Sequence, residues 1–279
     1  MASFKKIFWI NVIIVAFNLR APITAVGPII DIIKDKYYLN STVAGILTSL
    51  PLIAFGSISF IVGYFSPIRA IVYGRFFRIK KKAHKKINLF INLTTWKITL
   101  FMGFQSFLAY SLFFWYVQIV VEKGFDKEFS TSMVLFAQLV AAPVSLFGPL
   151  LLGKLRQNLH TFYIAGLCSM YVIAFGMLFI FDSKISIIIS AFIMGFPWGG
   201  VFGIALLFIA QKSSNAQIAA RLSALAQGFG YLIAAQGQWI IGFLHDKFEN
   251  FSFAILMLVF VGILVNIFGY LSYKSQIIK

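Results

Sequence analysis

Eight long apolar runs constrain the fold of this chain more than any other feature. They lie at residues 7–33, 42–65, 97–121, 131–153, 161–181, 185–210, 222–244 and 251–273. A helix needs about 20 apolar residues to cross a hydrocarbon core of roughly 30 Å, whereas a barrel strand needs only about 10. Of the 279 residues, 60% are hydrophobic and 11% are charged, which is more apolar surface than a soluble domain can bury. The sequence predicts an all-α membrane protein, a helical bundle of about eight transmembrane helices.

The charged residues sort to opposite sides of these runs. With the N-terminus in the cytoplasm, the inside segments hold 17 Lys and Arg residues, the outside segments hold six, and Arg20 lies within a run. All eight Asp and Glu residues lie in or at the edge of outside segments. Because cytoplasmic loops carry an excess of Lys and Arg, this pattern predicts an inner-membrane protein with both termini in the cytoplasm.

The most basic segment is RFFRIKKKAHKK, residues 75–86, between the second and third runs. No nucleic-acid-binding module surrounds it, so we interpret it as a cytoplasmic loop in contact with the lipid bilayer, and we expect no nucleic-acid partner. The runs contain no mid-membrane Asp or Glu, no His pair at metal-ligand spacing and no phosphate-binding glycine loop. We therefore expect no enzyme, no catalytic residue, no metal, no cofactor and no ATP-driven pump.

The first run contains a charged residue, Arg20, in the stretch NLRAPITAVGP. An arginine at this depth normally faces a bundle interior or a water-filled cavity. Because no carboxylate lies at its level, Arg20 is predicted to recognise an anionic solute; the alternative is that it braces the fold by donating to carbonyl or amide oxygens. We expect a substrate-binding lining made of Arg20, Asn18, Gln105, Tyr110, Gln227 and Tyr231.

Small residues mark the sixth run. Gly195, Gly199 and Gly203 repeat every four residues, and Pro197 interrupts the helical hydrogen-bond ladder between them. Glycines at this spacing let two helices approach closely, which predicts tight packing. The alternative interpretation is that the kinked helix forms part of a gate.

Several segments together resemble a known family. The first two runs contain NLRAPITAVGPII and STVAGILTSLPLIAFG; later runs contain WKITLFMGFQSFLAYSLFFW, VLFAQLVAAPVSLFGPLL, GFPWGGVFG and LSALAQGFGYLIAAQGQWIIGFLHD. In this order they resemble the cyanate-permease and nitroimidazole-transport branch of the major facilitator superfamily. The resemblance implies a helical transporter fold with a central solute site between two halves that rock against each other.

The chain departs from that family in length. The resemblance implies twelve spans in two halves of six, whereas this chain has eight runs and its motifs pass from those of the second span to those of the seventh. The family's third to sixth spans are therefore expected to be missing. We divide the chain into a two-span remnant of the N-terminal half (1–67), a basic cytoplasmic loop (68–96) and a six-span C-terminal half (97–279).

Three functions remain open at this stage. The first is secondary transport of a small anionic or polar solute, with a second copy of the chain or a partner subunit completing the cavity wall. The second is an internally deleted remnant that inserts in the membrane but transports nothing. The third is a membrane subunit without transport activity that binds another protein through its basic loop. The residues do not distinguish one substrate from another.

Overall fold

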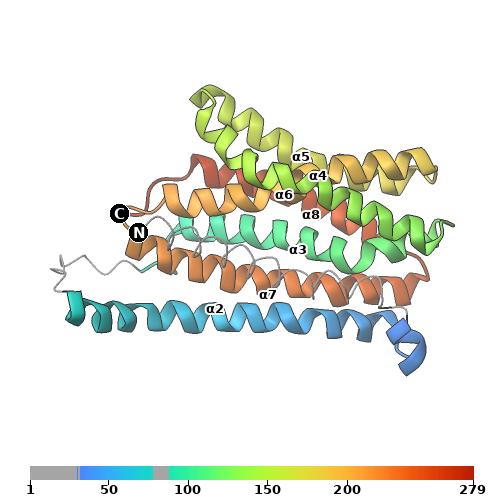
Figure 1. Cartoon of the computed structure of the whole chain (residues 1–279), viewed down its shortest axis with the longest axis horizontal. Coiled ribbons are helices and arrows are strands. Elements are labelled where there is room, and N and C mark those ends of the chain that lie inside the picture. The colour runs from blue at the N-terminus through green and yellow to red at the C-terminus, as the bar shows by residue number, and fades with distance from the viewer. Residues whose placement is uncertain (1–29, 31, 78–87) are drawn as a thin grey trace, which may run out of the picture.

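The protein is a bundle of long helices (Figure 1). The computed structural model describes residues 30, 32–77 and 88–279, with the backbone alone for 62–77. Its named helices are α2 (Ser41–Phe77), α3 (Leu93–Glu122), α4 (Lys127–Lys154), α5 (Gln157–Ile180), α6 (Lys184–Gln211), α7 (Ala216–Phe248) and α8 (Ser252–Lys274).

The predicted apolar runs and the observed helices correspond one to one from the second run onward. Within the described residues, seven helices are long and apolar enough to cross a membrane, with the candidate span of α2 covering Ser41–Ile61. The prediction of an all-helical membrane bundle is therefore confirmed. The expected first span, 7–33, lies almost entirely outside the described residues.

Helix occupies both ends of the segment expected to be a loop, 68–96. α2 continues to Phe77, because residues 68–77 contain only Gly74 as a helix-weakening residue. α3 begins at Leu93, four residues before the predicted start. The Asn92 side chain accepts a hydrogen bond from the Thr94 backbone N–H at 2.9 Å and so caps the first turn of α3.

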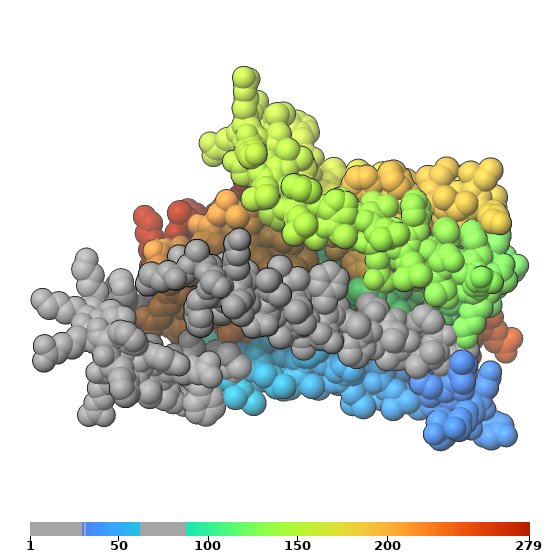
Figure 2. All heavy atoms as spheres, viewed as in Figure 1, coloured from blue at the N-terminus to red at the C-terminus, as the bar shows by residue number. Residues whose placement is uncertain are grey.

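The helices pack around α3. In the most apolar window of α3, 78% of the residues are buried, compared with 33% in α2 and 17% in α4. α7 lies between α3 and α2, while α4 packs on α6, and α5 packs on α8 and α6 (Figure 1). In Figure 2, α4 crosses this face of the molecule diagonally, in green, and α2 lies along its lower edge, in blue. In a bilayer, the apolar outer surfaces of these two helices would face lipid.

The C-terminal tail joins the ends of three helices. Lys212, directly after α6, donates to the backbone carbonyl oxygens of Tyr273 and Ser275, both at 2.6 Å. The Ile278 N–H donates to the Lys212 carbonyl at 2.8 Å, and the Thr94 hydroxyl donates to the Gln276 carbonyl at 3.2 Å. Burial lowers the pKa of Lys212. The tail thus connects α3, α6 and α8 at the end of the bundle that the charge pattern assigns to the cytoplasm.

Candidate functional site

The middle of α3 is buried except for a short, partly open stretch. Within residues 101–120, only Phe104, Ala109, Tyr110 and Phe113 keep partial exposure. Tyr110 and Phe113 are one turn apart, so they lie on the same face of α3. This face therefore holds most of the partly exposed residues of the central helix.

Aromatic rings from four helices meet at that face. Tyr110 contacts Tyr231 of α7 with ring centroids 6.0 Å apart, and Tyr231 contacts Phe55 of α2 at 5.8 Å. On the other side, Tyr110 lies 6.0 Å from Phe113, which meets Trp198 of α6 edge to face at 4.6 Å. These five side chains form an aromatic row that runs from α2 across α7 and α3 to α6. Such tilted and edge-to-face arrangements are the ones that aromatic quadrupoles favour.

The predicted polar lining is only partly gathered at this row. Gln227 lies one helical turn before Tyr231 on α7, half-buried, and its amide donates to the Ser223 hydroxyl at 2.7 Å. Gln105 lies elsewhere: its side chain is buried, and its amide donates to the Ser106 hydroxyl at 2.6 Å and to the Met102 sulfur at 3.5 Å. Five residues separate Gln105 from Tyr110, which places them about 140° apart around the helix.

Two members of the predicted lining belong to the first predicted span. Arg20 and Asn18 lie outside the described residues. Among the residues that are described, no group of three His, Cys, Asp or Glu side chains is arranged to hold a metal ion. Anion recognition by Arg20 therefore stays a prediction.

The glycines of α6 lie against α4. A methyl group on Gly199 would overlap the Ala141 carbonyl oxygen, and one on Gly195 would come within 2.7 Å of the Ala137 carbonyl oxygen. A methyl group on Gly203 would come within 2.5 Å of the Pro149 ring. α6 remains one helix across Pro197, which is buried. Gly195 and Gly199 thus bring α6 against the α4 backbone, and Gly203 lies against the Pro149 ring. A role of these glycines in gating stays a prediction.

Glycines also bring α2 against α7. A methyl group on Gly45 would overlap the Gln238 carbonyl oxygen, and one on Gly242 would overlap the Ser41 carbonyl oxygen. Nearer the other end of α7, a methyl group on Gly56 would lie 2.9 Å from the Gly228 carbonyl oxygen. These four glycines were not identified from the sequence, because their spacing within each helix is irregular.

Sequence reasoning also missed three members of the aromatic row. Phe55 and Phe113 are two of 33 phenylalanines, so neither stands out by residue type. Trp198 had a stronger signal, because it follows Pro197 within the GFPWGG segment. These three side chains meet because of which helices are neighbours in the bundle, and the sequence alone does not indicate those neighbours.

The fold and the spans define the general class of the protein, a multi-pass helical membrane protein. No family model matches the chain. It is 25% identical over 379 residues to the uncharacterized transporter YycB of Bacillus subtilis (strain 168), covering 95% of this chain and 94% of the relative. That alignment is 379 residues long and the chain has 279 residues, so at least 100 aligned positions have no residue of this chain.

Two further transporters match over shorter stretches. The chain is 30% identical over 185 residues to the 2-nitroimidazole transporter of Escherichia coli (strain K12), covering 66% of this chain and 46% of the relative. It is 25% identical over 177 residues to the cyanate transport protein CynX of the same organism, covering 61% of this chain and 44% of the relative. The chain is a distant homologue of transporters of the major facilitator superfamily.

Proposed function

We propose that this chain is a shortened secondary transporter that moves a small anionic or polar solute across the inner membrane. The observation that carries the proposal is the aromatic row, which contacts α2, α7, α3 and α6 and occupies the partly open face of α3. In a transporter of this type the solute binds between the two halves of the protein. The row crosses from α2, in the predicted N-terminal remnant, to helices of the predicted C-terminal half.

The chemistry of the row suits a small solute with a planar or charged group. The phenols of Tyr110 and Tyr231 combine an apolar ring with a hydroxyl that donates and accepts hydrogen bonds. Gln227 adds an amide one turn away on α7. Arg20 would supply the positive charge for an anion, with its planar guanidinium fork matching a planar oxyanion.

The length difference from the aligned relative supports the shortened architecture. At least 100 positions of the YycB alignment have no residue here. At about 20–25 residues for each membrane span, this length corresponds to roughly four helices. A cavity with four helices missing would be open on one side, so we propose that a second copy or a partner subunit covers it, with both termini in the cytoplasm.

Uptake by the purified chain tests the proposal. Proteoliposomes that contain only this chain should accumulate labelled cyanate or labelled 2-nitroimidazole above empty liposomes, the two solutes being chosen from the names of the relatives. Replacing Tyr231 with Ala should reduce that uptake at least tenfold, because it removes the ring that links α2 to α3. Tyr270→Ala is the matched control, since Tyr270 is 45% exposed on the outside of α8.

A non-transporting remnant is the second candidate, and the missing positions favour it directly. If the parent chain takes up neither solute and binds neither solute, the transporter proposal is wrong and the remnant is the better description. Binding without uptake would instead indicate a membrane subunit that has lost transport. If the parent and Tyr231→Ala took up the solute equally, the solute would bind at a site other than the aromatic row.

A further inference from the structure

A groove runs between α5 and α8 on the surface of the bundle. Its lining includes Val172 and Ile173 of α5 and Ile263, Ile267 and Leu271 of α8, and its volume is about 520 Å³. This volume lies within the range of roughly 300–1,000 Å³ that is usual for ligand pockets. Ile173, Ile263 and Ile267 are each between 44% and 50% exposed, so the groove is open to whatever surrounds the bundle.

Two contacts hold α5 and α8 together along the groove. A methyl group on Gly262 of α8 would come within 3.1 Å of the Val172 side chain of α5. The Asn266 amide of α8 donates to the Ala165 carbonyl oxygen at 3.1 Å and to the Ser169 hydroxyl at 2.6 Å. Because the N–H groups of this amide are directed at α5, the side chains left to line the groove are mainly aliphatic.

The groove covers about half of the membrane depth. Its lining on α8 extends from Ile263 to Leu271, which is about 12 Å of helix. Ile263 lies at the middle of α8, and the groove extends from there toward the end that the charge pattern assigns to the cytoplasm. One leaflet supplies half of a hydrocarbon core of roughly 30 Å. The groove thus matches the acyl chain of one leaflet, whereas a spanning helix of a second copy would need a contact surface of the full depth.

The cytoplasmic end of the groove is basic. Lys274 follows Leu271 by one helical turn, so it lies on the groove side of α8. Its ammonium is 6.0 Å from the centre of the Tyr273 ring, and the Tyr273 hydroxyl donates to the Gln157 carbonyl at the start of α5 at 3.4 Å. The exposed Arg156 directly precedes α5.

No carboxylate side chain neutralises this basic end. All eight Asp and Glu residues lie in or at the edge of the segments that the charge pattern assigns to the outside. Within the part of the chain that the structure describes, Lys274 forms no ion pair. Its positive charge therefore remains available to an anion at the membrane surface.

We propose that the α5–α8 groove binds an anionic phospholipid, with one acyl chain along Ile263, Ile267 and Leu271 and the phosphate group beside Lys274. The aliphatic lining and the length of the groove fit the acyl chain. In a bilayer, apolar contact alone does not favour one lipid over another, because lipid tails are as apolar as leucine. The preference for an anionic lipid comes from the charge of Lys274. The proposal does not depend on transport by the chain.

Native mass spectrometry of the purified chain, stripped of lipid in detergent, is the first test. Phosphatidylglycerol should bind about fivefold more tightly than phosphatidylcholine with the same acyl chains, the gain expected from one basic residue. Lys274→Gln should reduce the affinity for phosphatidylglycerol about fivefold and leave that for phosphatidylcholine unchanged, since only the charge is removed. Ile267→Trp should weaken the binding of both lipids, because the indole fills the groove.

Two matched controls and a competition experiment accompany these variants. Lys247→Gln removes an exposed lysine at the opposite end of the bundle, whose ammonium is 5.4 Å from the Phe248 ring. Ile189→Trp places an indole on α6, at a position that is 42% exposed. Both controls should bind phosphatidylglycerol as the parent does. Inorganic phosphate should not compete, because it has no acyl chain.

Three results of this test would overturn the proposal. They are equal affinities of the parent for the two lipids, a Lys274→Gln variant with the affinity of the parent, and competition by inorganic phosphate. If Ile267→Trp bound lipid normally but lost a dimer that the parent forms, the groove would belong to an interface between two copies, and the lipid proposal would be wrong.

Photocrosslinking in proteoliposomes locates the bound lipid. Phosphatidylglycerol with a diazirine in one acyl chain should label residues 169–173 and 263–271, and excess unlabelled phosphatidylglycerol should suppress the labelling more than phosphatidylcholine does. Lys274→Gln should reduce the labelling several-fold, whereas Lys247→Gln should not. Labelling that is spread equally over the exposed apolar residues of α4 would show that the contact is unselective and would contradict the proposal.

Discussion

The α4–α6 and α2–α7 interfaces both depend on glycine, but they are built differently. In α4–α6, Gly195, Gly199 and Gly203 lie on α6 at a spacing of four residues, and they face Ala137, Ala141 and Pro149 of α4. In α2–α7, Gly45 and Gly56 lie on one helix and Gly228 and Gly242 on the other. The first interface joins two helices of the predicted C-terminal half, whereas the second joins that half to the N-terminal remnant.

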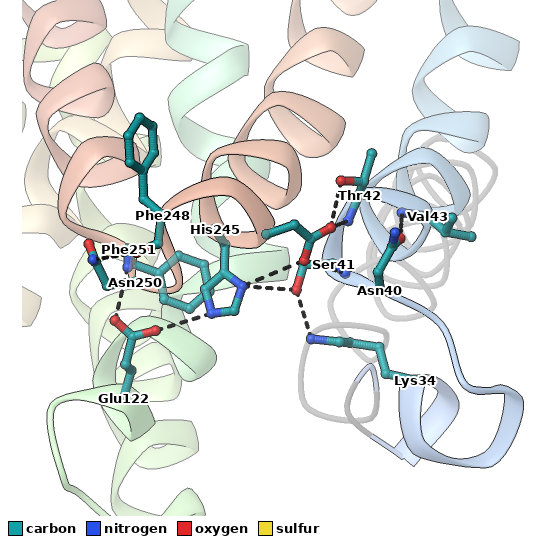
Figure 3. A network of polar contacts seen from close by, with 11 residues as sticks. Lys34, Asn40, Ser41, Thr42, Val43, Glu122, His245, Phe248, Asn250 and Phe251 are labelled. Atoms are coloured by element: carbon teal, nitrogen blue, oxygen red, sulfur yellow. Dashed lines mark hydrogen bonds and ion pairs between the residues drawn. The ribbon is translucent and has the colours of Figure 1, made fainter.

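The difference teaches which interface is fixed and which is suited to movement. Among the described helices, α6 packs on both α4 and α5, while α2 packs mainly on α7. The α2–α7 interface also ends in hydrogen bonds from the Ser41 and Thr42 backbone N–H groups of α2 to the Asp246 carboxylate of α7, at 2.9 and 2.7 Å (Figure 3). Backbone contact supplies close packing in both places, but only α2–α7 combines it with a polar connection at one end. We therefore interpret α4–α6 as part of a rigid body and α2–α7 as the adjustable boundary.

The largest loss of thermal stability should come from placing a bulky side chain in the α4–α6 interface. In Gly199→Leu, even the first side-chain atom would overlap the Ala141 carbonyl oxygen, so the helices must separate. Overpacking of this kind costs about 1–3 kcal/mol, so the unfolding midpoint should fall by roughly 2–12 °C. Gly166→Leu is the matched control, because a side chain there meets nothing within 4 Å. Equal midpoints for the two variants would disprove the close-packed interface.

Filling the α2–α7 interface should have a smaller effect on stability. Gly242→Leu would push against the Ser41 carbonyl oxygen, but α2 can move away without disturbing the helices around α3. We expect a loss of about 1–2 kcal/mol in the free energy of unfolding. Spin labels at Tyr38→Cys and Phe181→Cys, both exposed positions, should show a broader distance distribution in a Cys168→Ser background. The same Gly166→Leu variant serves as the control. If Gly242→Leu lowered the midpoint more than Gly199→Leu, α2 would belong to the rigid body and the comparison would be wrong.

Much of the fold was predictable, because a bilayer imposes simple rules on sequence. The length of each apolar run indicated a spanning helix, and the seven described helices follow the runs closely. Errors fell at the helix ends: the start of α3 was placed at 97 although Asn92 carries a recognisable capping signal. The regular glycine spacing of the sixth run indicated a close helix partner, but not that the partner is α4.

The candidate site was less predictable, because it depends on which helices are neighbours. Tyr110 and Tyr231 were both selected as polar residues within spans, and the structure brings their rings together. Gln105 was selected by the same rule but bonds with Ser106 and Met102. Residue type shows that a polar group is within a span, yet only packing decides whether it meets a neighbour in its own helix or a solute. The contacts of His245 with Glu122 of α3 and Ser41 of α2 were missed for the same reason.

The smallest loss of thermal stability should come from removing one hydrogen bond at the polar end of the α2–α7 interface. Thr42→Val keeps the shape of the side chain but removes the hydroxyl that donates to Asp246 at 2.6 Å. The Thr42 backbone N–H still donates to the same carboxylate at 2.7 Å, so the connection is weakened and not broken.

The site of this change is exposed, which limits its cost. Water can take the place of the lost hydroxyl, so the expected loss is about 0.5–1 kcal/mol, or a fall of roughly 1–4 °C in the unfolding midpoint. Thr42→Ser keeps the hydroxyl and should match the parent, which separates the hydrogen bond from the packing of the methyl group. If Thr42→Val were as damaging as Gly242→Leu, polar contacts and not glycine packing would hold α2 in place. The two interfaces would then differ in the force that holds them, and not only in how far they can move.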